Sequence, residues 1–197
     1  MSWRSNGPRR PGRGRSRRRR VLTDGGTDEP AGQAIDGAEL IDRLEGASIV
    51  TDDGADLRLT DEFAEVWQRR ARRVREGDRT VDHAAMILEV DPADLTVEER
   101  DGEYVARLAG RELGEWPSEA ALLADLALYP TLAEWLPVWE SLDGRSRGTL
   151  LARLRAFLEV CPACDGSLVA EERAGGEGTE VSLVCEACGQ VSFSGSY

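Results

Sequence analysis

All four cysteines of this 197-residue chain lie within its last 37 residues, as two Cys-x-x-Cys pairs. Cys-Pro-Ala-Cys occupies 161–164 and Cys-Glu-Ala-Cys occupies 185–188, with twenty residues between them. Each pair can form a tight turn whose backbone N–H groups donate to the sulfurs, and two such turns close a tetrahedral four-thiolate site. The spacing therefore predicts a structural Zn²⁺ that holds together a segment too short to fold alone, bound by Cys161, Cys164, Cys185 and Cys188. Redox use of the two pairs, and a catalytic metal with an open position, are the alternatives.

The residues around these pairs have the pattern of a small antiparallel sheet. Residues 167–172 and 179–184 predict a hairpin with its turn at 173–178, and 190–193 can add a third strand. Over residues 160–194 the chain resembles the zinc ribbon family, in its Cys-Pro-x-Cys plus Cys-x-x-Cys-Gly form. This resemblance implies a C-terminal three-stranded zinc ribbon. The chain departs from the family at Asp165, where many first turns have Gly, and Gly166 allows that turn to shift by one residue.

The charge of the chain is unevenly distributed. The 37 acidic residues outnumber the 25 basic ones for a net charge of −12, and every basic residue is Arg. Nine Arg lie in residues 1–20, so the sixteen others face all 37 acids and residues 21–197 carry −21. An acid excess without Lys resembles the proteins of salt-in haloarchaea, because molar salt shortens the Debye length to about 3 Å and weakens carboxylate repulsion. The acidity thus indicates the cytoplasm of a halophile rather than a ligand.

Composition also restricts the chemistry. Without Lys there is no P-loop lysine and no Schiff-base lysine, and a single His, His83, excludes a multi-histidine metal site. No pair of carboxylates stands out from the acidic background. We therefore expect a non-enzymatic protein with no catalytic residues, the alternative being a zinc- or carboxylate-dependent enzyme. No run of eighteen apolar residues occurs, so we expect no membrane span.

The composition divides the chain into three parts. Residues 1–34 predict a disordered Arg-rich arm and linker, in which 1–20 is either a nucleic-acid-binding tail or a mis-assigned start upstream of Val21. Residues 35–159 predict an α+β body, mainly helical with short β-hairpins, and residues 160–197 the zinc ribbon.

Within the body, caps and apolar periodicity predict the individual elements. Helices are expected at 36–46, at 60–77 with Thr60 as cap, at 80–89, from a cap at Ser118, at 132–142 and at 146–159. The helix at 132–142 is predicted from a capping box of Thr131 and Glu134. Strands are expected at 48–51 and 56–59, at 95–100 and 103–108 around Asp101-Gly102, and at 111–116.

Two features bear on the partner. The one basic patch of the body lies in the last turns of the helix at 60–77 and just beyond it, and consists of Arg69, Arg70, Arg72, Arg73, Arg75 and Arg79. With the preceding hairpin this helix resembles a fragment of a winged-helix domain, which implies a DNA-binding transcriptional regulator. The other interpretation is a helix end whose arginines pair with neighbouring acids.

The C-terminal segment is acidic. Residues 161–197 carry one Arg against six acids, which disfavours contact with phosphates. We therefore expect an adaptor or regulatory protein that contacts another protein through the ribbon.

Overall fold

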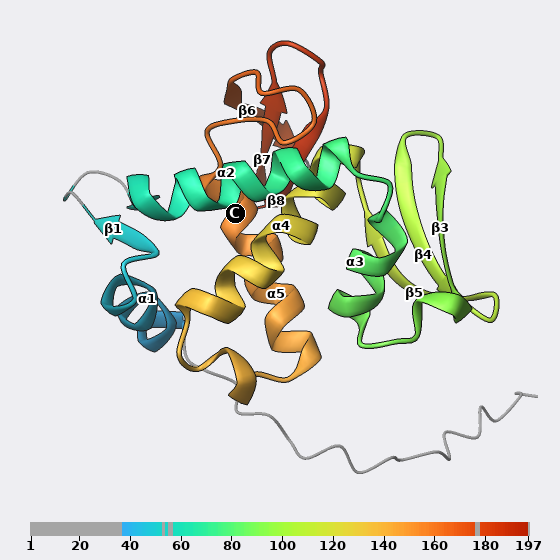
Figure 1. The fold of residues 1–197 in the computed structure, drawn as a ribbon. Helices are drawn as coiled ribbons and strands as arrows, with labels where there is room; N and C mark the ends of the chain where they lie inside the picture. The colour runs from blue at the N-terminus through green and yellow to red at the C-terminus, as the bar shows by residue number, and fades with distance from the viewer. Residues whose placement is uncertain (1–36, 53, 55–56, 176–177, 197) are drawn as a thin grey trace, which may run out of the picture. The chain divides into compact units, whose positions relative to one another are not determined.

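The computed structural model describes residues 37–52, 54, 57–175 and 178–196. Within this part of the chain the fold is α+β, as predicted, with five α-helices and three small antiparallel sheets (Figure 1). The Arg-rich arm assigned to residues 1–34 lies outside the described residues. No helix in the described ranges has the length and apolar character needed to cross a bilayer.

A short helix and a short hairpin begin the described chain. Helix α1 spans Gly37–Gly46, and strands β1 (Val50–Asp52) and β2 (Leu57–Leu59) pair antiparallel. Ile49, Val50 and Leu59 are buried in the core. Burial of these side chains specifies the register of the hairpin, because a slip of one residue would turn them outward.

Helix α2 (Asp61–Glu76) begins where its predicted cap stands. The side chain of Thr60 accepts a hydrogen bond from the N–H of Phe63 at 3.3 Å, which satisfies one free donor of the first turn. One apolar face of the helix packs inward through Phe63, Trp67, Ala71 and Val74.

Helix α3 (Thr80–Leu88) leads into the predicted hairpin. Strands β3 (Leu95–Arg100) and β4 (Glu103–Leu108) pair around Asp101 and Gly102, whose φ angles are 53° and 90°. Two positive φ values are what a two-residue hairpin turn requires, and Asp-Gly supplies them at low cost. Strand β5 (Arg111–Trp116) completes this sheet.

In place of the two helices predicted for residues 118–142, one helix ends at Trp135 and a 3₁₀ turn follows at Trp139–Ser141. Helix α4 (Glu119–Trp135) continues through Pro130, so the predicted capping box at Thr131 is wrong. Thr131 is buried, and its hydroxyl donates to the carbonyl of Ala127 at 2.7 Å inside the helix. A hydroxyl bonded back along its own helix does not cap a new one. Pro130 removes one backbone N–H, but burial of the surrounding apolar side chains keeps the helix whole.

Helix α5 (Gly144–Leu154) differs from the prediction at both ends. It begins two residues earlier because Asp143 is its cap: the Asp143 carboxylate accepts the N–H of Ser146 at 2.7 Å. It ends in a 3₁₀ turn at Arg155–Phe157 rather than continuing to residue 159.

The C-terminal segment forms the predicted three-stranded sheet. Strands β6 (Leu168–Gly175), β7 (Gly178–Cys185) and β8 (Val191–Ser196) lie in the order β6-β7-β8, all antiparallel. The β6–β7 pairing extends to Gly175 opposite Gly178, so the hairpin is longer than predicted. Residues 176–177 of its turn lie outside the described residues.

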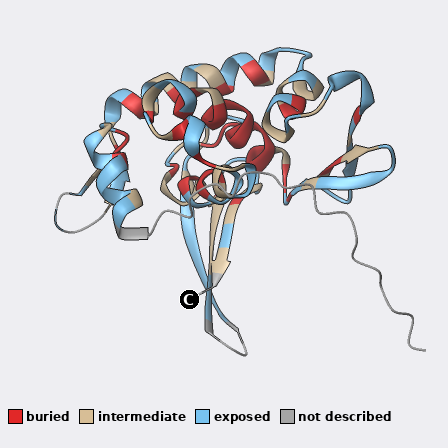
Figure 2. Ribbon diagram, turned by 90° about the horizontal axis from the view of Figure 1, so that it is seen from below, coloured by how far each residue is buried: buried red, intermediate tan, exposed pale blue. Residues whose placement is uncertain are grey.

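Helix α4 is the centre of the body. It packs against α2, α3, α5 and β8. Its side chains belong to two hydrophobic clusters, one containing Trp67, Leu132 and Trp139 and the other Trp116 and Leu126. Most of the helix is buried on every side, as the concentration of buried residues there shows (Figure 2). The N-terminal end of α4 meets the sheet that carries the cysteines.

Candidate metal centre

The two Cys-x-x-Cys pairs fold into two turns with the same hydrogen bonds. In each, the residue after the second cysteine donates its N–H to the carbonyl of the first, at 2.8 Å from Asp165 to Cys161 and at 2.9 Å from Gly189 to Cys185. The first cysteine of each turn donates its own N–H to the carbonyl five residues further on, at 2.8 and 2.9 Å. Because these backbone hydrogen bonds match, the two Cys-x-x-Cys turns have the same conformation.

Asp165 occupies the position that glycine holds in the second turn. Its φ is 61° and that of Gly189 is 72°, so the expected shift of the first turn by one residue does not occur. Asp is one of the few residues that tolerate this left-handed conformation. Gly166 is required for another reason, because a Cβ there would lie 2.7 Å from the Cβ of Ala187 and 3.0 Å from the sulfur of Cys185.

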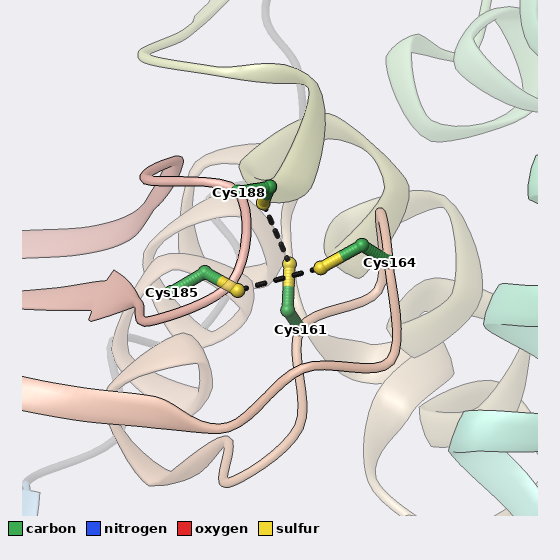
Figure 3. Close-up of side chains that lie close together, drawn as sticks. All are labelled: Cys161, Cys164, Cys185 and Cys188. Carbon is green, nitrogen blue, oxygen red and sulfur yellow. Dashed lines mark hydrogen bonds between the residues drawn. The ribbon is translucent and has the colours of Figure 1, made fainter.

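The four sulfur atoms form a compact cluster (Figure 3). All lie within 4.8 Å of one another, with 3.8 Å between Cys161 and Cys188 and 3.4 Å between Cys164 and Cys185. A tetrahedral ion with metal–sulfur bonds of about 2.3 Å needs sulfur–sulfur separations of about 3.8 Å. The cysteines are therefore positioned to hold a metal ion, and their spacing fits a four-thiolate site.

The environment of the sulfurs differs within each pair. Cys161 and Cys185 are buried, whereas Cys164 and Cys188 are exposed. Burial raises the pKa of the Cys161 thiol, against the backbone N–H groups of its own turn. Burial also acts to raise the pKa of Cys185, but the N–H groups of its turn and the neighbouring sulfurs lower it to about 7. The N–H groups of both turns thus point at the first sulfur, as the spacing predicts, and favour the thiolate that a metal binds.

The cluster packs against the N-terminal end of α4. Ala120, in the first turn of that helix, is buried together with Cys161 and Cys185. Ser118 caps α4 by accepting the N–H of Ala121 at 3.0 Å, and its hydroxyl also donates to the carbonyl of Val191. The positive end of the helix dipole thus lies beside the cysteine sulfurs, where it would stabilise the thiolate form that a metal binds.

Gln190 makes a second link between the cysteine turns and α4. Its side-chain carbonyl accepts the backbone N–H of Ala120 at 2.7 Å, and its side-chain nitrogen lies 3.4 Å from a carboxylate oxygen of Glu119. Gln190 follows directly on the second turn, so the metal centre and the helix are joined through one side chain.

Helix α2 contacts the first turn from another side. Arg72 Nε donates to Asp165 Oδ1 at 3.0 Å and Arg75 Nη2 donates to Asp165 Oδ2 at 2.7 Å. Arg75 also donates to the carbonyl of Pro162 at 3.1 Å. Two arginines of the predicted basic patch therefore bind the loop that carries Cys161 and Cys164.

Three of the four other arginines of the patch also lie near acids. Arg69 is 3.8 Å from Glu65, and Arg70 donates to Glu134 of α4. Arg79 donates to Asp82 of α3 at 2.9 Å, and Arg73 is exposed on α2. This pairing is the one expected of a helix end surrounded by acids. DNA binding through these arginines stays a prediction.

Other polar residues were missed or interpreted differently from the sequence. His83 lies apart from the four-cysteine cluster and lines a small cavity with Arg70 and Arg73. Gln190 carried no sequence signal, because its role depends on a contact seventy residues away. Asp125 did carry a sequence signal, because it is the only charged residue in the mainly apolar stretch 120–133, and it is buried in the structure.

A family model matches more than half of the chain, residues 39–156, and describes the central domain of a family of unknown function, DUF8054. The chain belongs to the DUF8054 family. The DUF8054 central domain runs from α1 into the 3₁₀ turn after α5, so the four cysteines follow it directly in the sequence. No curated protein and no solved structure matches the chain.

Proposed function

We propose that the four cysteines bind one structural zinc ion and that the C-terminal sheet is a zinc ribbon. The sulfur spacing, the paired turns and the N–H groups aimed at Cys161 and Cys185 support this. Four thiolates fill a tetrahedral shell and leave no position for a substrate. The ion would hold the turns against α4 and α2, and so join the ribbon to the DUF8054 domain.

The metal is tested by elemental analysis of the purified chain. We expect one zinc per chain, and after exchange with cobalt the visible spectrum of a tetrahedral thiolate complex. Cys188→Ser should reduce the metal content, whereas Ser194→Ala, a change in an exposed residue of β8, should not. Clearly less than one zinc per chain in the unaltered protein would overturn the assignment.

We further propose that the protein is a non-enzymatic adaptor or regulatory protein that uses the ribbon to contact another protein. The observation that carries this is the edge of the sheet at β6. Beyond its first residues this strand has no paired neighbour on its outer side within the described chain, and Val169 to Ala174 are exposed. The opposite edge strand, β8, begins against α4. An exposed edge can accept a strand from a partner.

The charge of the ribbon supports a protein rather than a nucleic acid as that partner. From Cys161 onward Arg173 is the only basic residue, against six acids. Phosphate groups are bound mainly by Lys and Arg, so a nucleic acid would be repelled. The four thiolates with a divalent zinc ion add about two more negative charges.

Affinity capture with the full chain tests the proposal. Val169, 37% exposed on β6, and Ile41, 41% exposed on α1, offer a matched pair of substitutions. Val169→Glu should abolish capture of a partner that the unaltered chain and Ile41→Glu both retain. Equal capture of the partner by both variants would mean that the contact lies elsewhere on the chain. If the unaltered chain binds DNA and the Arg73→Glu variant does not, a DNA-binding regulator would be favoured instead.

The acidic composition supports a further proposal, that the protein works in the salt-rich cytoplasm of a halophile. Carboxylates repel one another strongly at low ionic strength and little in molar salt, where the Debye length is about 3 Å. The chain should therefore unfold more readily as KCl is removed. A midpoint of unfolding that is independent of KCl would contradict the proposal.

A further inference from the structure

A cavity of about 260 Å³ lies between α3, β5, α4 and α5, away from the four-cysteine cluster. Leu88, Leu113, Trp116 and Leu151 contribute apolar walls. Gly148 of α5 is exposed at its edge, and nothing lies within 4 Å of the position its Cβ would take. The absent side chain keeps the cavity open to solvent on that side.

Asp125 presents an unused acceptor to this cavity. The residue is 7% exposed, in the middle of α4. Its Oδ2 accepts the indole N–H of Trp116 at 2.9 Å, while its Oδ1 has no hydrogen-bond partner among the described residues. A buried carboxylate oxygen without a hydrogen-bond donor is costly, and the described chain offers this atom only the nearby charge of Arg155.

Arg155 presents unused donors beside it. Its Nε forms a buried ion pair with Asp125 Oδ1 at 3.6 Å, beyond hydrogen-bond distance, and its Nε and Nη1 are buried without a hydrogen-bond acceptor in the described part of the chain. The second arginine of the cavity is different, because Arg147 donates to Glu89, to the hydroxyl of Tyr129 and to the carbonyl of Trp139. Arg155 is thus the guanidinium of the cavity whose buried nitrogens have the ion pair with Asp125 but no hydrogen-bond acceptor among the described residues.

The charges constrain what that ligand can be. A plain anion on Arg155 would lie next to the Asp125 carboxylate, and a plain cation on Asp125 next to the guanidinium, so either would meet a like charge at close range. A molecule with a carboxylate and an ammonium group side by side satisfies both residues with charge-assisted hydrogen bonds. In an α-amino acid these two groups are attached to one carbon, which matches an acceptor and a donor only 3.6 Å apart.

We propose that this cavity binds a free α-amino acid, whose carboxylate accepts from Arg155, whose ammonium donates to Asp125 Oδ1, and whose side chain lies against Trp116 and Leu113. The volume of about 260 Å³ is below the usual range for drug-sized ligands and suits a molecule of this size. The site uses none of the cysteines and none of the β6 edge. A test of amino-acid binding is therefore independent of the proposed zinc ribbon and of its proposed protein contact.

The experiment is calorimetric titration of the full-length zinc-loaded chain with each of the twenty amino acids in turn, and with acetate and methylammonium as single-group probes. We expect at least one amino acid to bind, and acetate and methylammonium each to bind about tenfold or more weakly. The indole N–H signal of Trp116 in a ¹H–¹⁵N spectrum, assigned with Trp116→Phe, should shift on binding because Trp116 hydrogen-bonds the same carboxylate.

Two variants of α5 locate the site without altering its charges. Gly148→Leu fills the mouth of the cavity, and Thr149→Leu adds similar bulk to an exposed neighbour that does not line it. Both replacements favour helix, so both variants should fold. We expect Gly148→Leu and Arg155→Leu to weaken binding about tenfold or more, and Thr149→Leu to leave it unchanged. No binding by any amino acid up to about 10 mM, acetate binding as tightly as the amino acids, or equal affinity of the two α5 variants would overturn the proposal.

Discussion

Arg75 of α2 donates to Asp165 Oδ2 at 2.7 Å and thereby ties the first cysteine turn to the body. Arg72 donates to the other oxygen of the same carboxylate at 3.0 Å. Hydrogen bonds from Arg75 and Arg72 hold the pKa of Asp165 below its usual range. Asp165 is also the residue that replaces glycine in that turn, with φ of 61°. An aspartate satisfies both requirements at once, because it tolerates the left-handed conformation and offers a carboxylate to α2.

The first prediction concerns the strength of this link. In a double-mutant cycle of Arg75→Gln and Asp165→Asn, we expect a coupling of about 0.5–1 kcal/mol in the free energy of unfolding. The value is modest because the side chains are 24% and 39% exposed and solvent screens their attraction. Urea denaturation at low and molar salt measures it, and the coupling should shrink in molar salt.

The control for this cycle is the pair Glu39 and Arg43, which is exposed within α1 and joins no two parts of the fold. Arg75→Gln should increase hydrogen exchange in the first cysteine turn, and Arg43→Gln should not. A coupling of zero together with unchanged exchange would mean that the ion pair does not anchor the turn.

The second prediction separates two glycines of the metal centre. Gly166→Ala should weaken zinc binding by about tenfold or more, because its Cβ would lie 2.7 Å from the Cβ of Ala187 and 3.0 Å from the sulfur of Cys185. Gly189→Asn should be tolerated, because nothing lies within 4 Å of its Cβ and Asn accepts its φ of 72°. Competition with a chelator measures both affinities. Equal affinities would show that the first turn relaxes around an added methyl group.

The third prediction concerns Ser118, which caps α4 and also donates to Val191 of β8. Ser118→Ala should cost about 2 kcal/mol of stability, since it removes a cap and leaves the Val191 carbonyl without its donor. Asp143→Ala, at the cap of α5, should cost about 1 kcal/mol, because that side chain accepts only from its own helix. Hydrogen exchange in β8 should rise in the first variant and not in the second.

The metal centre was the part of the molecule most open to prediction from sequence. Two pairs of cysteines with fixed spacing predict both the residues and their clustering, because a Cys-x-x-Cys turn is a local structure that depends on few neighbours. The same holds for the Asp101-Gly102 hairpin and for the cap at Thr60. In each case the decisive hydrogen bonds join residues only a few positions apart.

The predictions from sequence were wrong or incomplete where the structure depends on contacts between residues far apart in the chain. Thr131 looks like a cap in sequence, and only the burial of α4 against both hydrophobic clusters explains why the helix continues through Pro130. The contacts of Gln190 with Ala120 and of Arg75 with Asp165 span 70 and 90 residues. The orphaned groups of Asp125 and Arg155 likewise emerge only when α4 and the turn after α5 are packed together.

The last prediction concerns the pH dependence of stability. Burial raises the pKa of Asp125 from an ordinary value of 3.8 to about 6, against the charge of Arg155 and the hydrogen bond from Trp116. Below about pH 4 the carboxyl is protonated in both states and contributes no penalty. As the pH rises from about 4 to 6, the unfolded chain releases this proton and the folded chain retains it, so stability falls. Above about pH 7 the loss should level off at about 3 kcal/mol.

The measurement is the free energy of unfolding of the unaltered chain and of Asp125→Asn between pH 4 and 8, without added amino acids. Many other carboxylates and the cysteines also titrate, but they contribute equally to both proteins, so the difference isolates Asp125. That difference should move in favour of Asp125→Asn by about 3 kcal/mol as the pH rises. The other charged side chains that line the same cavity are Arg155, Arg147 and Glu115, and both proteins contain them, so they do not account for the difference between the two curves. A difference that stays constant with pH would show that Asp125 ionises as readily in the folded chain as in the unfolded one.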